Sequence, residues 1–273
     1  MEFFNTLETI LRISQPEKKC NAFEVFYRRY LEQNNAIRFA HDTPPVIFEK
    51  ASFETICHIV PATTLPKRSA LSTIEGKARL LHAIAHIEYS AIDLALDHTY
   101  RFRNMPDTFY RDWLEVAKEE ITHFQMLEAL LHELGYRYGD FPVHTFLFDM
   151  AKKTPDLLTR MAVVPRYLEA AGLDANPIII EKLKRIGDTM SKKIIEALHI
   201  ILEEETDHVR KGDRWFRYAC KQEGVDPENY FDIVERVLPG AKKKKGFVNV
   251  TLRKKAGFSC DEIRVISSQP CIE

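Results

Sequence analysis

The spacing of apolar residues along the chain predicts a mostly helical protein. Over residues 71–103, apolar side chains recur every three or four positions, with one glycine and no proline, which is typical of a long helix. Pro106 falls in the first turn of a second long helix, which should end before Gly135. Interrupted helical patterns follow over 143–171, and another long helix is expected over 188–220.

The remaining segments carry weaker patterns. A helix is expected over 17–33, whereas four prolines within 42–66 indicate an irregular strap. Residues 172–177 are expected to form a loop whose proline opens a short helix, and Asp226-Pro227 should start another. A short alternating run over 246–252 is a weak strand signal. The chain is therefore expected to be all-α.

Two of the long helices place a glutamate and a histidine one turn apart within an apolar stripe. Glu120 and His123 share the buried face of one helix, and Glu205 and His208 repeat the arrangement on another. Burying ionised carboxylates without a partner costs much more free energy than the nearby contacts return. Two such pairs therefore indicate a bound cation.

A further glutamate precedes each pair at a similar distance. Glu88 lies on the apolar face of the first long helix, 32 residues before Glu120, and Glu169 lies 36 residues before Glu205. One Glu from each of two helices and Glu-x-x-His from each of two others form the ligand set of dimetal carboxylate bundles. Oxygen ligands mixed with imidazole suit iron first and manganese next, although the set does not exclude zinc. We predict two metal ions held by Glu88, Glu120, His123, Glu169, Glu205 and His208.

Several neighbours of these ligands are candidates for supporting roles. Arg166 lies within one turn of a predicted glutamate ligand and is placed to orient its carboxylate. Tyr89 is a candidate donor to a bound oxygen species, although filling the core is the simpler role. Asp93 is a candidate acceptor for a ligating histidine. His82 and His86, four residues apart, could bind metal or a ligand, but ordinary helix-surface or interface histidines are expected.

Composition changes this picture little. The 273 residues are 45% hydrophobic and 29% charged with a net charge of −1, which is typical of a globular protein without an overall electrostatic preference. The sequence lacks an apolar run long enough to cross a membrane and a signal-peptide pattern, so a cytoplasmic location is expected. The five cysteines are scattered without a Cys-x-x-Cys motif, which predicts mostly free thiols and no cysteine-bound iron or zinc centre.

The last part of the chain is more basic than the rest. Residues 241–273 contain eight Lys/Arg against three Asp/Glu. Such a run is typical of a solvated tail; the alternative is a patch for nucleic acid, because clustered cations gain affinity by releasing condensed counterions. Three segments are expected: a helix and strap over 1–68, a dimetal bundle over 69–224, and a short helix with a basic tail over 225–273.

Six short motifs within residues 69–220 carry a family likeness: His86-Ile-Glu-Tyr-Ser-Ala-Ile-Asp-Leu-Ala95, Phe109-Tyr-Arg-Asp-Trp113, Gly139-Asp-Phe-Pro142, Met161-Ala-Val-Val-Pro165, Leu168-Glu-Ala-Ala-Gly-Leu-Asp174 and His208-Val-Arg-Lys-Gly-Asp-Arg-Trp-Phe216. Their order resembles the bacterial ferritin-like family catalogued as domain of unknown function 455. Ala171 stands where that family has arginine, which puts one polar contact in doubt. The resemblance implies a ferritin-like four-helix bundle with additional terminal segments and supports the same metal ligands. More distantly, the set is similar to rubrerythrins, manganese catalases and a tRNA-modifying di-iron hydroxylase.

The ligand set favours an oxidoreductase that activates dioxygen or peroxide. An external electron donor is expected, because the sequence has no four-cysteine iron site. A hydroxylase acting on RNA is one version, favoured slightly by the basic tail. The alternatives are oxidation, detoxification or storage of iron or manganese, and a non-enzymatic scaffold stabilised by metal. A homodimer is expected from the general behaviour of helix-pair bundles.

Overall fold

The computed structural model describes residues 2–32, 44–65 and 70–272, and all regular elements within these ranges are helices. The described ranges also contain an isolated parallel β-bridge between Ile59 and Val143. The prediction of an all-α chain is confirmed. The described ranges leave out residue 33 of the predicted helix and residues 42, 43 and 66 of the predicted strap. No helix in the described ranges is both long and apolar enough to span a bilayer.

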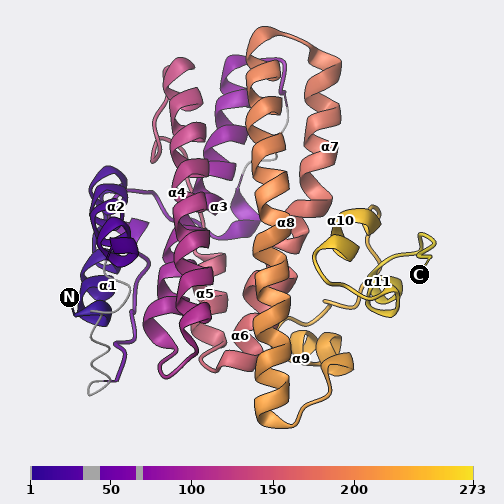
Figure 1. Ribbon diagram of the computed structural model, residues 1–273. Coiled ribbons are helices and arrows are strands. Elements are labelled where there is room, and N and C mark those ends of the chain that lie inside the picture. The colour runs from indigo at the N-terminus through magenta and orange to yellow at the C-terminus, as the bar shows by residue number, and fades with distance from the viewer. Residues whose placement is uncertain (1, 33–43, 66–69, 273) are drawn as a thin grey trace. The chain divides into compact units, whose positions relative to one another are not determined.

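The chain divides into two compact units, Met1–Phe148 and Asp149–Glu273. The first unit is built on α3 (Ile74–Arg101) and α4 (Asp107–Glu133), two long neighbouring helices joined by a short turn (Figure 1). The Thr73 side chain caps α3 by accepting a 3.0 Å hydrogen bond from the Gly76 amide.

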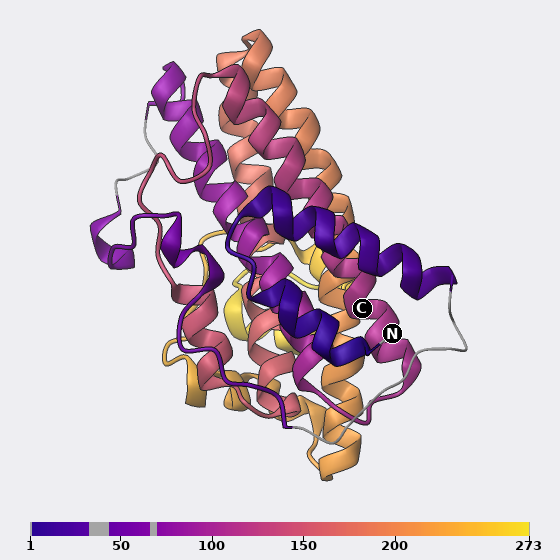
Figure 2. The ribbon, with the colours of Figure 1, turned by 90° about the vertical axis from the view of Figure 1, so that its left-hand side faces the viewer.

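The remaining elements of the first unit cover this helix pair. Helix α1 packs on α3, and α2 packs on α4 and α1; Figure 2 turns both toward the viewer. Two single-turn 3-10 helices interrupt the irregular strap, and α5 begins in this unit and ends in the second. The bounds are α1 Phe3–Leu11, α2 Pro16–Glu32, η1 Ser52–Thr55, η2 Ala62–Thr64 and α5 Phe146–Lys153.

A second pair of long helices, α7 and α8, forms the centre of the second unit. A short π-helical turn, η3, leads directly into α7 and packs on α8 together with α6. Gly187 ends α7 with a positive φ of 72°, and Asp188 caps α8 by accepting a 2.7 Å bond from the Ser191 amide. The bounds are α6 Leu157–Val163, η3 Val164–Leu168, α7 Ala170–Ile186, α8 Thr189–Glu223, η4 Pro227–Asn229, α9 Tyr230–Val237, α10 Val250–Lys255 and α11 Cys260–Ile266.

Two local predictions are wrong. Residues 172–177 are not a loop but the first turns of α7, with Pro177 inside the helix. Buried Leu173 and the ion-paired side chain of Asp174 hold this stretch in helical form, so tertiary contacts outweigh the loop signal of its glycine and proline. Residues 246–252 form no strand, because α10 begins at Val250.

The C-terminal segment, residues 238–272, is folded and corrects the prediction of a solvated tail. Arg253 is fully buried and forms an ion pair with Asp174 on α7. Cys260 and Cys271 are joined by a disulfide, which corrects the expectation of free thiols for these two residues. Their Cα atoms lie 5.4 Å apart because the chain turns back after α11, a proximity that sequence spacing does not reveal. The prediction of free thiols holds for the three buried cysteines Cys20, Cys57 and Cys220.

Candidate metal centre

The first half-site is the cluster of Glu88, Glu120 and His123 in the first unit. Glu88 projects from α3, and Glu120 and His123 project from successive turns of α4. The His123 Nδ1 atom lies 3.2 Å from a carboxylate oxygen of Glu88 and 3.5 Å from one of Glu120. One ligand atom from each residue lies within 4.8 Å of the others, and all three side chains are buried, so together they can hold a metal ion.

The electrostatics of this half-site favour a cation between its carboxylates. Burial, and then the charge of neighbouring Glu120, raises the pKa of Glu88 to about 8, against the hydrogen bond from His123. Burial by itself would lower the pKa of His123, but hydrogen bonds and charges from Glu120 and Glu88 raise it well above its usual range. In the metal-free protein, protons bound to these side chains therefore offset the negative charge that a divalent cation would otherwise neutralise. The donor chemistry of the three residues fits iron or manganese.

The local sequence explains how these ligands come to be buried. Ile84 and Ile92 lie one turn before and one turn after Glu88 on α3, and both are buried. On α4, Val116 lies one turn before Glu120 and Leu127 lies one turn after His123, and both are buried. Since the apolar stripes of α3 and α4 pack on each other, the glutamates within the stripes are carried into the interior.

The second predicted half-site is the set of Glu169, Glu205 and His208, all in the second unit. Glu205 and His208 lie one turn apart on α8 and are buried, and Glu169 is half-buried at the junction of η3 and α7. Both η3 and α7 pack on α8, so the three residues belong to contacting elements. The second unit thus carries the same residue types as the first, one Glu and one Glu-x-x-His.

The π-helical turn before Glu169 lies very close to α8. A Cβ atom on Gly212 would lie 2.8 Å from Cβ of Pro165 and 3.2 Å from the backbone nitrogen of Arg166. Only a residue without a side chain allows this approach. The extra residue of a π turn shifts the phase of the following helix, and such turns are frequent at functional sites. Gly212 and η3 therefore set where Glu169 stands relative to α8.

Two predicted supporting residues have other partners. The Arg166 guanidinium forms ion pairs with Asp213 and Glu262 rather than with the carboxylate of Glu169. Asp93 accepts hydrogen bonds from Lys19 and Ser52 rather than from a ligating histidine. The reason is burial: Lys19 and Arg166 are fully enclosed, and each requires a carboxylate partner.

The tyrosine and histidines beside the first half-site have structural roles. The Tyr89 hydroxyl donates to the backbone carbonyl of Ser14, 3.1 Å away. The His86 ring bonds the Tyr138 hydroxyl and a backbone carbonyl at 3.0 and 2.8 Å, and the His82 ring accepts from the Gly139 amide at 2.9 Å. Burial lowers the pKa of both histidines to about 4, so they stay neutral at pH 7. Both histidines are buried, so the expected helix-surface position is wrong, and their role as non-ligands stays a prediction.

Sequence reasoning missed a set of charged residues near the second half-site. Asp174, Asp213, Arg253 and Glu262 are all buried and are joined to one another or to Arg166 through ion pairs. Two of them lie inside the motifs that carry the family likeness, Asp174 in Leu-Glu-Ala-Ala-Gly-Leu-Asp and Asp213 in the α8 motif. Their position inside these motifs was the available sequence indication of a role, because neither residue is spaced like a metal ligand.

Comparison with known proteins adds a family but no activity. A family model described as protein of unknown function, DUF455, matches residues 12–264. An uncharacterized protein of Haemophilus influenzae is 38% identical over 273 residues, an alignment that covers 96% of this chain and 92% of that protein. No solved structure matches the chain.

Proposed function

We propose that this chain, which belongs to the DUF455 family, is a ferritin-like dimetal carboxylate protein that acts as an oxidoreductase on dioxygen or peroxide. The main support for this proposal is the buried cluster of Glu88, Glu120 and His123, whose ligand atoms are close enough together to bind one metal ion. The second unit carries the same residue types at the junction of η3 and α7 and on α8. The proposal is that the two half-sites complete one centre, as in four-helix dimetal bundles.

The predicted ligands and the residues around them would have different roles in this reaction. Four carboxylates and two neutral imidazoles balance the charge of two divalent ions, and the burial of Glu120 and His123 keeps bulk water away from them. Bound there, two redox-active ions would supply electrons and open coordination positions for dioxygen or peroxide. The aromatic side chains of Tyr89, Phe124 and Tyr138 pack against one another in the same unit as the first half-site and add to its apolar core.

Metal stoichiometry and reactivity test this proposal directly. Anaerobic loading with Fe(II) should give two ions per chain by elemental analysis, and admitting air should then produce a new near-ultraviolet and visible absorption. Glu120→Gln and Glu205→Gln, one in each half-site, should each bring the content below two. Glu115→Gln on α4 and Glu203→Gln on α8 are matched controls, because both residues are exposed on the same helices.

Each other outcome identifies an alternative. Less than one ion per wild-type chain would overturn the dimetal proposal. Many ions per chain in a shell-sized particle would indicate storage, and two ions without any change in air would indicate a metal-stabilised scaffold.

The basic C-terminal segment gives little support to RNA as the substrate. Lys242 pairs with Asp232, Lys245 pairs with Asp174, and Lys244 donates to backbone carbonyls of its own unit. Arg253, Lys254 and Arg264 are engaged in the same unit as well. A cation that is already paired releases fewer counterions on meeting a polyanion. An organic substrate without a requirement for nucleic acid therefore fits the segment better.

A further inference from the structure

The C-terminal segment contacts Arg166, three residues before Glu169, and Ala170, directly after it. From these contacts we infer that it acts as a clamp that positions this ligand, with Glu262 and Arg253 as the positioning residues. The inference rests on the proposed function, because it assigns Glu169 to the metal centre. Its evidence lies entirely within the second unit.

The first contact is made through Arg166, three residues before Glu169 in the π-helical turn. Its Nη2 atom donates to both carboxylate oxygens of Glu262, at 2.8 and 2.9 Å, and its Nε atom donates to Asp213 at 2.7 Å. Glu262 belongs to α11 and Asp213 to α8, so one fully buried guanidinium joins three elements. A planar guanidinium held by two carboxylates has little freedom to rotate.

Aromatic rings enclose the same guanidinium. The Arg166 Cζ atom lies 3.8 Å from the ring centre of Tyr230, 4.6 Å from that of Phe258 and 5.1 Å from that of Phe216. Cation–π attraction and packing thus restrict the residue from the sides that the carboxylates leave open. The turn that carries Arg166 is fixed accordingly, and Glu169 follows at its end.

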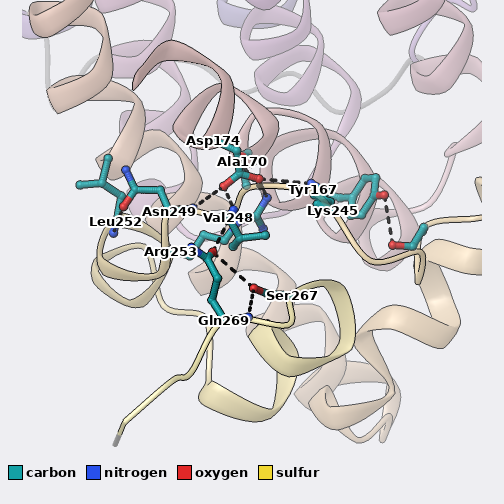
Figure 3. A network of polar contacts seen from close by, with 11 residues as sticks. Tyr167, Ala170, Asp174, Lys245, Val248, Asn249, Leu252, Arg253, Ser267 and Gln269 are labelled. Carbon is teal, nitrogen blue, oxygen red and sulfur yellow. Dashed lines mark hydrogen bonds and ion pairs between the residues drawn. The ribbon is translucent and has the colours of Figure 1, made fainter. Parts of the chain in front are cut away.

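The second contact is made through Arg253, which holds the residue directly after Glu169. Its Nη2 atom donates to the backbone carbonyl of Ala170 at 3.1 Å (Figure 3). The same guanidinium forms two bonds to the Asp174 carboxylate, at 3.0 and 2.7 Å, and the backbone N–H of Asn249 donates to that carboxylate at 2.9 Å. The first turn of α7 is thereby tied to α10.

The clamp is itself rigidly built. Glu262 accepts a 2.8 Å bond from the Ser259 amide, and the Ser259 hydroxyl accepts a 3.1 Å bond from the Glu262 amide, so α11 begins with a capping box. A Cβ atom on Gly257 would lie 2.7 Å from a carboxylate oxygen of Asp213, so the loop between α10 and α11 lies directly against α8. The segment that the sequence marks as a basic tail therefore reaches both α8 and η3.

Two conservative variants test the clamp without removing a ligand. Glu262→Gln keeps the shape of the side chain and removes its charge, and Arg253→Lys keeps a charge near Asp174 but shortens the reach to Ala170. Asp261→Asn and Lys254→Ala are matched controls at the adjacent, exposed positions. With Co(II) as the probe, both test variants should bind one of the two ions about tenfold or more weakly. Their visible spectra should change because the ligand geometry around that ion changes, while the controls should match the wild type.

Hydrogen–deuterium exchange of the metal-free full-length chain gives a second readout. Peptides covering residues 164–171 should exchange faster in Glu262→Gln and Arg253→Lys than in the wild type and the controls. If both variants keep wild-type Co(II) affinity, spectrum and exchange, the clamp is overturned and the proposed function survives. If the wild type takes up no Co(II), the proposed function falls and the positioning role falls with it.

Discussion

At the scale of single residues, Glu88, Glu120 and His123 show how position decides the chemistry of a side chain. Glu115 and Glu119 lie on the same helix as Glu120 but outside its apolar stripe, so they remain at or near the surface. Glu120 is fully buried beside Glu88, and burial, followed by the charge of Glu120, raises the pKa of Glu88. The metal-free half-site must therefore hold protons that a metal would displace.

Metal binding at the first half-site should release protons. Because the pKa of Glu88 is raised to about 8 and that of His123 is raised further, both groups carry a proton at pH 7 in the metal-free state. Titration calorimetry with Mn(II) in buffers of different ionisation enthalpy should detect this release at pH 7. The release should fall by about one proton as the pH rises from 6.5 to 9, through the pKa of Glu88.

The Glu88→Gln variant identifies the source of that pH dependence. Its proton release should no longer change across this pH range, although its affinity for Mn(II) will be lower. A wild type that releases no protons at pH 7 would contradict the assigned protonation of the half-site.

At the scale of elements, the contact between η3 and α8 depends on the absence of a side chain at position 212. Glycine within a helix normally lowers stability relative to alanine. Here the close approach of Pro165 and Arg166 leaves no room for a methyl group, so the usual preference should be reversed.

The Gly212→Ala variant should destabilise the protein by about 1–3 kcal/mol, because the added methyl group would overlap Pro165. Gly172→Ala is the matched control: it lies inside α7 with nothing within 4 Å of the added carbon. The control should instead stabilise the protein by about 0.5–1 kcal/mol. Chemical denaturation measures both values. Equal or greater stability of Gly212→Ala would show that the contact is not tight.

At the scale of the whole molecule, the two compact units carry the same donor set on separate pairs of helices. The family model covers residues 12–264 and so includes both sets as well as Glu262 of the clamp. A metal ion bound by one unit alone would protect that unit alone. Ions shared by the two half-sites would stabilise both, and this difference separates one joint centre from a site in the first unit. The homodimer and the cytoplasmic location remain predictions.

Metal loading should therefore protect both units at once. At a free Mn(II) concentration about 100 times the Kd, binding to the folded state alone should add about 2.7 kcal/mol to the free energy of unfolding. Hydrogen exchange should slow in α3 and α4 and equally in α7 and α8. The double variant Glu120→Gln with Glu205→Gln should show neither effect. Protection confined to α3 and α4 would indicate a site in the first unit instead of a joint centre.

The helices and the burial of most candidate ligands follow from the sequence by itself. Apolar spacing places Glu88, Glu120 and His123 inside helical stripes, and stripes are local patterns that any core-facing helix must satisfy. The second Glu-x-x-His, at Glu205 and His208, was equally visible. These features are predictable because they depend on residues only three or four positions apart.

Only the tertiary structure decided which charged residues pair and what the C-terminal segment does. The bonds from Arg166 to Asp213, from Arg253 to Asp174 and from Arg166 to Glu262 span 47, 79 and 96 residues. No periodic pattern connects positions so far apart, since each bond depends on how several helices pack. For the same reason, composition alone indicated a solvated tail for a segment in which Arg253 is fully buried and paired with Asp174.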